Sequence, residues 1–289
     1  MILTYIKVQI QLELYKIMEC KDIVKEWQKE FPILSKYTPS TLFAQAGIVL
    51  IGLRLERDWD TYRIFLEILP LWVPKEKIIH PVFGEETLDE KGFQIFIDTR
   101  LHDTSLTDYI EAQKLRGVTH IDIKKYELEG AKRRKIIEKA IGCVHRQFDS
   151  VLQENVGLSD IFRLINDHTS TICFDRSNPL DWYRLFELKL ALAYYFNRED
   201  LILKVKHEIE KEASLWTQKR FNLLFSVSKE EWRDDLYHRM EDRETFMRQV
   251  EMNLALKKIS RLKKIHIHDD VEPRNTLLHK FNQLLRLDK

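Results

Sequence analysis

The chain has 289 residues, of which 44% are hydrophobic and 32% are charged. This composition excludes intrinsic disorder, which requires low hydrophobicity and high net charge, and the low counts of Gly (8) and Pro (7) exclude collagen-like and low-complexity chains. Lys and Arg (47) nearly balance Asp and Glu (46), so no overall electrostatic field directs the chain toward nucleic acid or an acidic ligand.

The first elements along the chain mix strand and helix patterns. Apolar and polar side chains alternate over residues 7–14, which favours a half-buried strand, although a helical spacing of the same residues stays open. Residues 21–30 have the apolar spacing of an amphipathic helix. Thr38-Pro39 has the form of a helix N-terminus, and the short helix that follows is expected to end at Gly47.

Residues 48–69 carry the clearest pattern in the chain, two alternating runs on either side of a short polar turn. They predict a β-hairpin with one apolar face, on which Leu53 and Leu66 represent the two strands. This shared face fixes the register, because a slip by one residue would expose it. On the opposite face we expect Arg54 and Glu67 to be exposed, with charges of opposite sign that can pair across the strands.

A third strand is expected over residues 93–99, and beyond about residue 104 the apolar period becomes that of a helix. No glycine follows Gly157, so the rest of the chain is expected to consist of helices joined by short polar corners. Ser228 and Glu231 have the spacing of a capping box, and the helix that they begin is expected to continue past Leu254. The other helices are expected over residues 125–152, 158–165, 179–196, 199–217 and 274–287.

Together these patterns predict an α+β protein with two domains. The N-terminal domain, residues 1–117, is expected to hold a small antiparallel sheet that includes the hairpin 48–69. The C-terminal domain, residues 118–289, is expected to be mostly helical.

The sequence also bears on the compartment. It contains no uncharged apolar run of about 18 residues, so we expect no membrane-spanning helix and no membrane partner. Lys7 and Glu13 interrupt the apolar start of the chain, which argues against a signal peptide. Cys20, Cys143 and Cys173 are odd in number and far apart, which predicts a cytoplasmic location without disulfides.

Motifs for phosphate binding and nucleophilic catalysis are missing from the sequence. It has no GxGxxG, no GxxxxGK[ST] and no GxSxG. Cys143 and His145 are two residues apart on a predicted helix and therefore point away from each other. We interpret Cys143 as a small core residue, and we expect no cofactor.

Two groups of His and Asp residues are candidates for a metal site. The order of His80 followed by His102-Asp103 is similar to that of metal-dependent HD phosphohydrolases, but those ligands lie on helices, whereas here a loop and a strand end are predicted. His266, His268 and Asp269 could hold a divalent cation if the segment is extended, because imidazoles two residues apart then face the same way. We favour a polar connector between helices there, and we expect no bound metal.

Basic and aromatic residues supply the candidates for a partner-binding surface. Residues 252–268 contain no acid, and their cations could contact phosphates or an acidic protein surface, or simply be solvated at the end of a helix. Tryptophan, tyrosine and arginine are common at the centres of protein interfaces. The candidates are Trp59, Trp72, Arg100, His102, Lys257, Lys258, Arg261 and Lys264.

The function that these observations favour is binding rather than catalysis. We expect a non-enzymatic, cytoplasmic, microbial protein that binds another protein, as a regulator, an immunity-type inhibitor or an assembly factor. A metal-dependent hydrolase that uses the His and Asp residues is one alternative. A nucleic-acid-binding protein that uses the basic residues 257–264 is the other.

Overall fold

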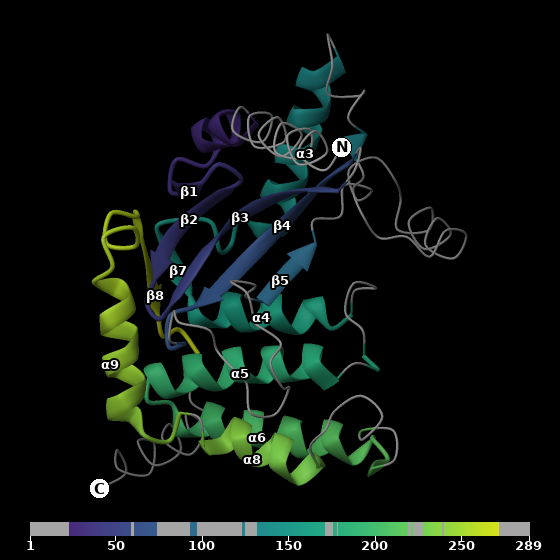
Figure 1. Cartoon of the computed structure of the whole chain (residues 1–289), viewed down its shortest axis with the longest axis vertical. Helices are drawn as coiled ribbons and strands as arrows, with labels where there is room; N and C mark the ends of the chain where they lie inside the picture. Colours follow the sequence, from purple (N-terminus) through teal and green to yellow (C-terminus); the bar gives the residue numbers. More distant parts are fainter. Residues whose placement is uncertain are drawn as a thin grey trace, which may run out of the picture.

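The computed structural model shows an α+β protein in which a mixed β-sheet packs against a layer of helices, and it confirms the predicted fold class (Figure 1). The structure describes residues 23–58, 61–73, 93–96, 123–124, 132–170, 176–177, 179–218, 221, 228–238 and 240–271. The strands are β1 (Ser35–Thr38), β2 (Thr41–Ala46), β3 (Val49–Asp58), β4 (Thr61–Pro70), β5 (Phe93–Phe96), β6 (Ile123–Lys124), β7 (Asn155–Gly157) and β8 (Lys264–His268). The helices are α3 (Lys132–Phe148), α4 (Leu158–His168), α5 (Pro179–Tyr195), α6 (Glu199–Ser214), α8 (Lys229–His238) and α9 (Arg243–Leu254), and residues 23–30 are also helical.

The predicted hairpin is confirmed as β3 and β4. The two strands pair antiparallel along their whole length, with Leu53 directly opposite Leu66, and both leucines are buried. On the other face Arg54 pairs with Glu67, as its charge predicted, with 3.3 Å between Nη1 and Oε1. The expectation that both residues are exposed was wrong, because Glu67 is only 1% exposed and Arg54 is half-buried. This part of the sheet is therefore covered on both faces.

The short helix expected before Gly47 is instead strand β2. All six residues of β2 are buried, so the strand lacks the alternation that would reveal it in the sequence. Thr38 does not begin a helix: its Oγ1 accepts a hydrogen bond from the Ser40 amide at 3.2 Å, in the turn between β1 and β2. Gly47, with φ of 58°, lies in the two-residue turn to β3, where a left-handed conformation favours glycine.

Strand β8 joins distant parts of the chain into one sheet. The strand order is β5-β4-β3-β2-β8-β7, with β1 paired to β2 and β6 to β4. β8 runs parallel both to β2 and to β7. The polar connector expected around residues 266–270 is therefore wrong for its first part, because Ile265 is buried and the backbone of this segment is used in strand pairing. The sheet is mixed rather than purely antiparallel.

The C-terminal helices follow the predicted order with one correction. The capping box at Ser228 is confirmed, since its Oγ accepts from the Glu231 amide at 3.1 Å and Glu231 Oε2 accepts from the Ser228 amide at 2.7 Å. The long helix expected from there past Leu254 is instead two helices, α8 and α9. Asp242 begins the second one, because its Oδ1 accepts from the Thr245 amide at 3.1 Å.

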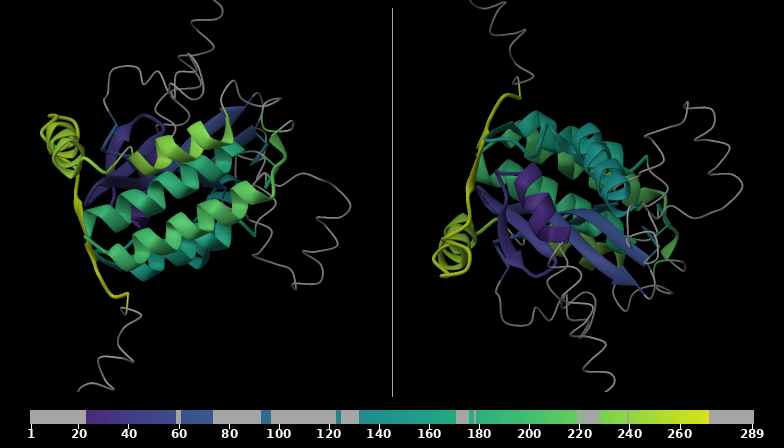
Figure 2. Two further views of the ribbon diagram at one scale, coloured as in Figure 1. Left: turned by 90° about the horizontal axis from the view of Figure 1, so that it is seen from below. Right: turned by 90° about the horizontal axis from the view of Figure 1, so that it is seen from above.

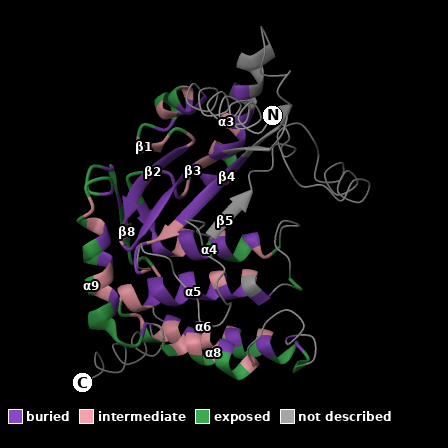
Figure 3. Cartoon of the chain, viewed as in Figure 1, coloured by how far each residue is buried: buried purple, intermediate pink, exposed green. Residues whose placement is uncertain are grey.

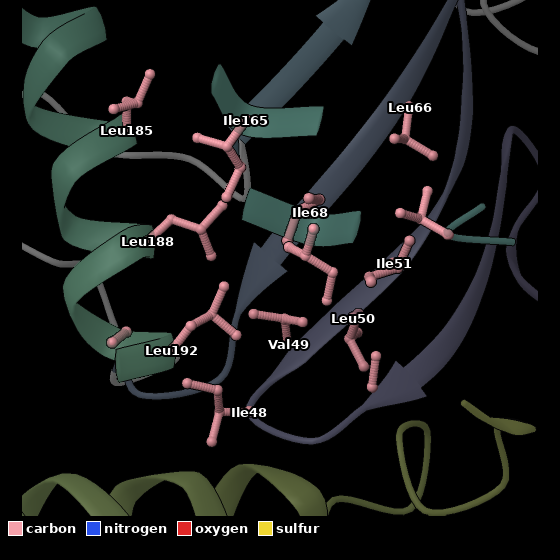
Figure 4. Close-up of a cluster of buried hydrophobic side chains, with 14 of the residues drawn as sticks. Ile48, Val49, Leu50, Ile51, Leu66, Ile68, Ile165, Leu185, Leu188 and Leu192 are labelled. Carbon is pink, nitrogen blue, oxygen red and sulfur yellow. The ribbon is translucent and has the colours of Figure 1, made fainter. Parts of the chain in front are cut away.

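The helices are arranged as a layer with one helix across its end. Helices α5, α6 and α8 run side by side, and α9 crosses their direction next to β8 (Figure 2). Burial is concentrated in the sheet and on the helix faces turned toward it, while the outer helix faces are exposed (Figure 3). Between the layers, Leu188 and Leu192 of α5 and Ile165 of α4 lie against Val49 and Ile68 of the hairpin (Figure 4).

Several expectations fall outside the described residues. They are the strand over residues 7–14, the domain boundary near residue 117 and the terminal helix over residues 274–287. The buried hydrophobic residues of the described parts, from Ile23 to Ile265, belong to one core cluster with the exception of Phe65. The division into two domains stays a prediction.

Candidate functional site

The basic residues predicted to extend a helix lie on a series of turns that leads into β8. Helix α9 ends at Leu254, and residues 255–262 form turns. Two long-range contacts hold this segment on the sheet: Gln45 Nε2 donates to the Ile259 carbonyl at 2.5 Å, and the Gln45 amide donates to the Lys263 carbonyl at 2.8 Å. Because Ile259 and Leu262 are also buried, the segment follows the sheet instead of continuing the helical ladder.

The cations of this segment are turned outward. Lys257, Lys258, Arg261 and Lys264 are all exposed. Lys258 places its Nζ 3.7 Å from the centre of the Tyr37 ring, a cation–π contact with β1. Among the described residues, no carboxylate pairs with Lys257, Arg261 or Lys264. We call Lys257, Lys258, Arg261 and Lys264 the cationic surface.

Strand β8 continues this exposed side with a row of nitrogen-bearing side chains. Lys264, His266 and His268 alternate along the strand and are exposed, whereas Ile265 between them is buried. His266 lies opposite Asn155 of β7, which is also exposed. Because a strand rises about 3.3 Å per residue, side chains of the row follow one another at about 6.6 Å. We call Lys264, His266 and His268 the β8 row.

The two aspartates that follow the β8 row are engaged by other parts of the fold. Asp269 Oδ1 accepts from Nη1 of Arg198 at 2.5 Å, and the same guanidinium also binds Asp200 through two hydrogen bonds of 2.8 Å. Asp270 accepts from both the amide (2.8 Å) and the hydroxyl (2.6 Å) of Ser159. These contacts attach the end of β8 to the N-termini of α6 and α4.

Electrostatics agree with this structural role. The hydrogen bonds from Arg198 hold the pKa of Asp200 below its usual range. Partial burial alone would raise the pKa of Asp270, but the hydrogen bonds from Ser159 outweigh it and the net pKa is lowered. Both carboxylates are therefore stabilised in the charged form. Arg198 occupies the cap position of α6 without a side-chain cap, and its guanidinium instead clamps Asp200 and Asp269.

The structure separates the residues of the metal hypothesis. His266 and His268 share the exposed side of β8, but Asp269 is bound to Arg198. In the part of the chain that the structure describes, no group of three potential His, Cys, Asp or Glu ligands comes together. His80, His102 and Asp103 lie outside the described residues.

Of the remaining candidates, Trp72 is placed in the core. It is 7% exposed, and its Nε1 donates to Glu187 of α5 at 3.3 Å, so it contributes to packing and not to an exposed surface. Trp59, Arg100 and His102 lie outside the described residues. Cys143 is fully buried on α3, as predicted for a core residue. His145 forms a hydrogen bond of 2.7 Å with Asp149 on the exposed side of the helix.

Sequence reasoning missed the clamp formed by Arg198 and the cap that Asp270 supplies to α4. Arg198 and Asp269 are 71 positions apart, and Ser159 and Asp270 are 111 positions apart, so no local spacing connects them. The only sign of these contacts in the sequence was the pair of adjacent acids, Asp269 and Asp270, directly after the alternating residues 264–268.

Comparison with known proteins gives no match to a family model, to a curated protein or to a solved structure. None of the described helices is long and apolar enough to span a membrane.

Proposed function

We propose that this chain is a non-enzymatic protein that binds an acidic partner protein through the cationic surface. The observation that supports this proposal most directly is the exposure of Lys257, Arg261 and Lys264 without a carboxylate partner among the described residues. Unpaired cations on one side of a fold attract an acidic surface and steer its approach.

The rigid attachment of these cations also supports binding. The segment is fixed to β2 by Gln45 and to β1 by Lys263, whose amide donates to Ser35 Oγ at 3.0 Å. Its charges are therefore presented in a defined arrangement, which reduces the entropy lost on association. A partner of complementary shape can then distinguish this surface from other exposed lysines.

Protein is a better candidate than nucleic acid for the partner class. Proteins that bind single strands stack bases on exposed aromatic rings. Tyr37, the aromatic ring next to these cations, already contacts Lys258 over its ring and packs against Phe43 in a T-shaped arrangement with 5.3 Å between ring centres. The near-zero net charge of the chain likewise lacks the strong positive field typical of nucleic-acid binding.

We further propose a cytoplasmic location, which the cysteine pattern supports. A metal-dependent hydrolase is not favoured, because Asp269 and Asp270, which follow His268 in the chain, are bound to Arg198 and Ser159.

The test is affinity capture from a lysate of the source organism with the full chain and with the variant Lys257→Glu, Lys258→Glu, Arg261→Glu. A matched control reverses Lys204, Lys211 and Arg248, which are exposed cations on α6 and α9. We expect the wild type and the control to retain a stoichiometric protein with an acidic surface, and the first variant to lose it. Equal capture by all three proteins would contradict the proposal, and loss of capture after nuclease treatment would assign the surface to nucleic acid.

A further inference from the structure

Residues 263–271, which contain β8 and the residues on either side of it, join β2 to β7. The first two residues of β8 pair with Gln45 and Ala46 of β2, and its last three residues pair with β7. In the described part of the sheet, β7 has no other partner strand. The segment, drawn in yellow after α9, runs along one side of the molecule (Figure 2). We call residues 263–271 the strap.

The strap buries little apolar surface. Within β8 only Ile265 is buried, Ile267 is half-buried, and the side chains of the β8 row are exposed. The hairpin differs, because β3 and β4 pair over ten residues each and Leu53, Ile64 and Leu66 are at most 1% exposed. Segments with few buried apolar contacts open at a lower free energy than the core does. The strap is therefore expected to open before the hairpin.

Polar contacts hold the first end of the strap. The Lys263 amide donates to Ser35 Oγ at 3.0 Å, and its Nζ donates to the Pro32 carbonyl. The Lys263 carbonyl accepts from the Gln45 amide at 2.8 Å. All of these groups can bond to water instead, so each contact contributes only modestly to the attached form.

Polar contacts also hold the other end. Arg198 donates to Asp269 at 2.5 Å and to the Val271 carbonyl at 2.7 Å. Ser159 donates to Asp270 through its amide and its hydroxyl. Because Asp269 and Asp270 are exposed, water can replace these contacts too. We call Asp269 and Asp270 the latch.

We propose that the strap detaches from the sheet as a local unit while the hairpin stays folded, and that its attachment controls the cationic surface. Residues 257–264 lead directly into the strap, and Lys264 belongs to both. When the strap detaches, the contact between Gln45 and Lys263 is lost, and the end of the cationic surface is no longer fixed to β2.

The consequence for binding rests on the proposed function. A partner that requires the fixed arrangement of cations binds the attached form, and its apparent affinity falls in proportion to the fraction of chains in that form. Partner binding in turn shifts the population toward the attached strap. The latch, at the far end of the strap, is then a second place at which the cationic surface can be regulated.

Hydrogen exchange of the full chain, measured by mass spectrometry without a partner, tests local detachment. The variant Ile64→Val removes one buried methyl group from the hairpin and is expected to accelerate exchange in β3 and β4 about fivefold. Exchange in the strap is expected to stay at the wild-type rate, because the detached form keeps the hairpin folded. Equal acceleration of both regions would show that the strap opens only on global unfolding and would overturn the inference.

The same variant tests the control of the cationic surface. Peptides over residues 255–262 are expected to follow the strap and to keep their wild-type exchange rate. If these peptides accelerate with the hairpin while the strap does not, the cationic surface stays fixed when the strap detaches, and the proposed control is overturned.

The latch is tested by Asp269→Ala with Asp270→Ala, which is expected to accelerate exchange in the strap about tenfold. The matched control is Asp167→Ala with Glu251→Ala, which removes two exposed acids of α4 and α9 and is expected to keep the strap near its wild-type rate. An unchanged strap in the latch variant, or equal acceleration in the control, would overturn the role of the latch. Because no partner is present, failure of these tests leaves the proposed function intact, and failure of affinity capture leaves the detachment of the strap intact.

Discussion

The guanidinium of Arg54 on β3 lies 3.3 Å from the carboxylate of Glu67 on β4, and the Glu67 side chain is only 2% exposed. The two residues are diagonal neighbours on the same face of the hairpin, since Glu67 lies opposite Gly52 in the register. Loss of one partner of a buried ion pair weakens the compensation of the other charge, and costs of about 3–5 kcal/mol have been found for such pairs. We expect Arg54→Met to lower the free energy of unfolding by about 3 kcal/mol, at the lower end because Arg54 is partly exposed.

Urea unfolding of the purified chain measures this change, and Arg54→Lys is the control that keeps the charge. The conservative variant is expected to lose less stability than Arg54→Met. An unchanged urea midpoint for Arg54→Met would show that Glu67 does not depend on this cation.

The hairpin could be predicted because its information is local. Alternation along β3 and β4 identifies both strands, and a shared apolar face sets their register. β2 gives no such pattern, because all of its residues are buried and Phe43 packs on the face opposite to Leu42. The Thr38-Pro39 signal then favours a helix that the tertiary structure does not form, since strand pairing with β3 outweighs the local preference.

The candidate site was less predictable than the hairpin, because its geometry depends on contacts between residues far apart in the chain. Charge alone predicts that the residues of the cationic surface are exposed. Their arrangement could not be predicted, because the turn and β8 are held by residues such as Gln45, more than 200 positions away in the chain. A helical continuation is the natural interpretation when those partners are unknown.

Asp270 is expected to stabilise the N-terminus of α4 in a pH-dependent way. Gly157, at the cap position, has no side chain that could cap this helix. The Asp270 carboxylate accepts a hydrogen bond from the Ser159 amide instead. Replacement of a capping side chain by Ala costs about 1 kcal/mol, so we expect Asp270→Ala to lower the free energy of unfolding by that amount near neutral pH. Because the folded pKa of Asp270 is lowered, its contribution is present above the unfolded value of about 3.9 and is lost as the pH falls through the folded pKa.

The measurement is the difference in unfolding free energy between the wild type and Asp270→Ala at pH 6 and in a series of more acidic buffers. The difference is expected to shrink below about pH 4. Ser159→Ala completes a double-mutant cycle, in which the two changes should be less than additive because they remove the same contacts. A difference that does not vary with pH, or fully additive effects, would rule out this account.

A third prediction concerns metal binding by His266 and His268. We expect elemental analysis of untagged, purified protein to find far less than one zinc, manganese or iron per chain. The physical reason is that the carboxylates that could complete the site are bound to Arg198 and Ser159. About one metal per chain, lost in the variant His266→Ala with His268→Ala, would contradict this prediction and favour the hydrolase alternative.

The last prediction separates folding from binding at the cationic surface. Reversal of Lys257, Lys258 and Arg261 to Glu is expected to leave the chain folded. Lys258 loses its contact with Tyr37, worth about 0.5–1 kcal/mol at an exposed site. Lys257 and Arg261 lie on exposed turns, where a substitution changes stability by about 0.5 kcal/mol or less.

Binding should respond much more strongly than folding. Charges at the rim of an interface act mainly on the rate of association, so surface plasmon resonance with the identified partner should show a slower association rate and a weaker dependence on salt. The reversal of Lys204, Lys211 and Arg248 changes the net charge equally and is expected to leave the association rate near that of the wild type. Unfolding of the first variant would show that its cations are structural, and equal association rates for the two variants would show that only the net charge matters.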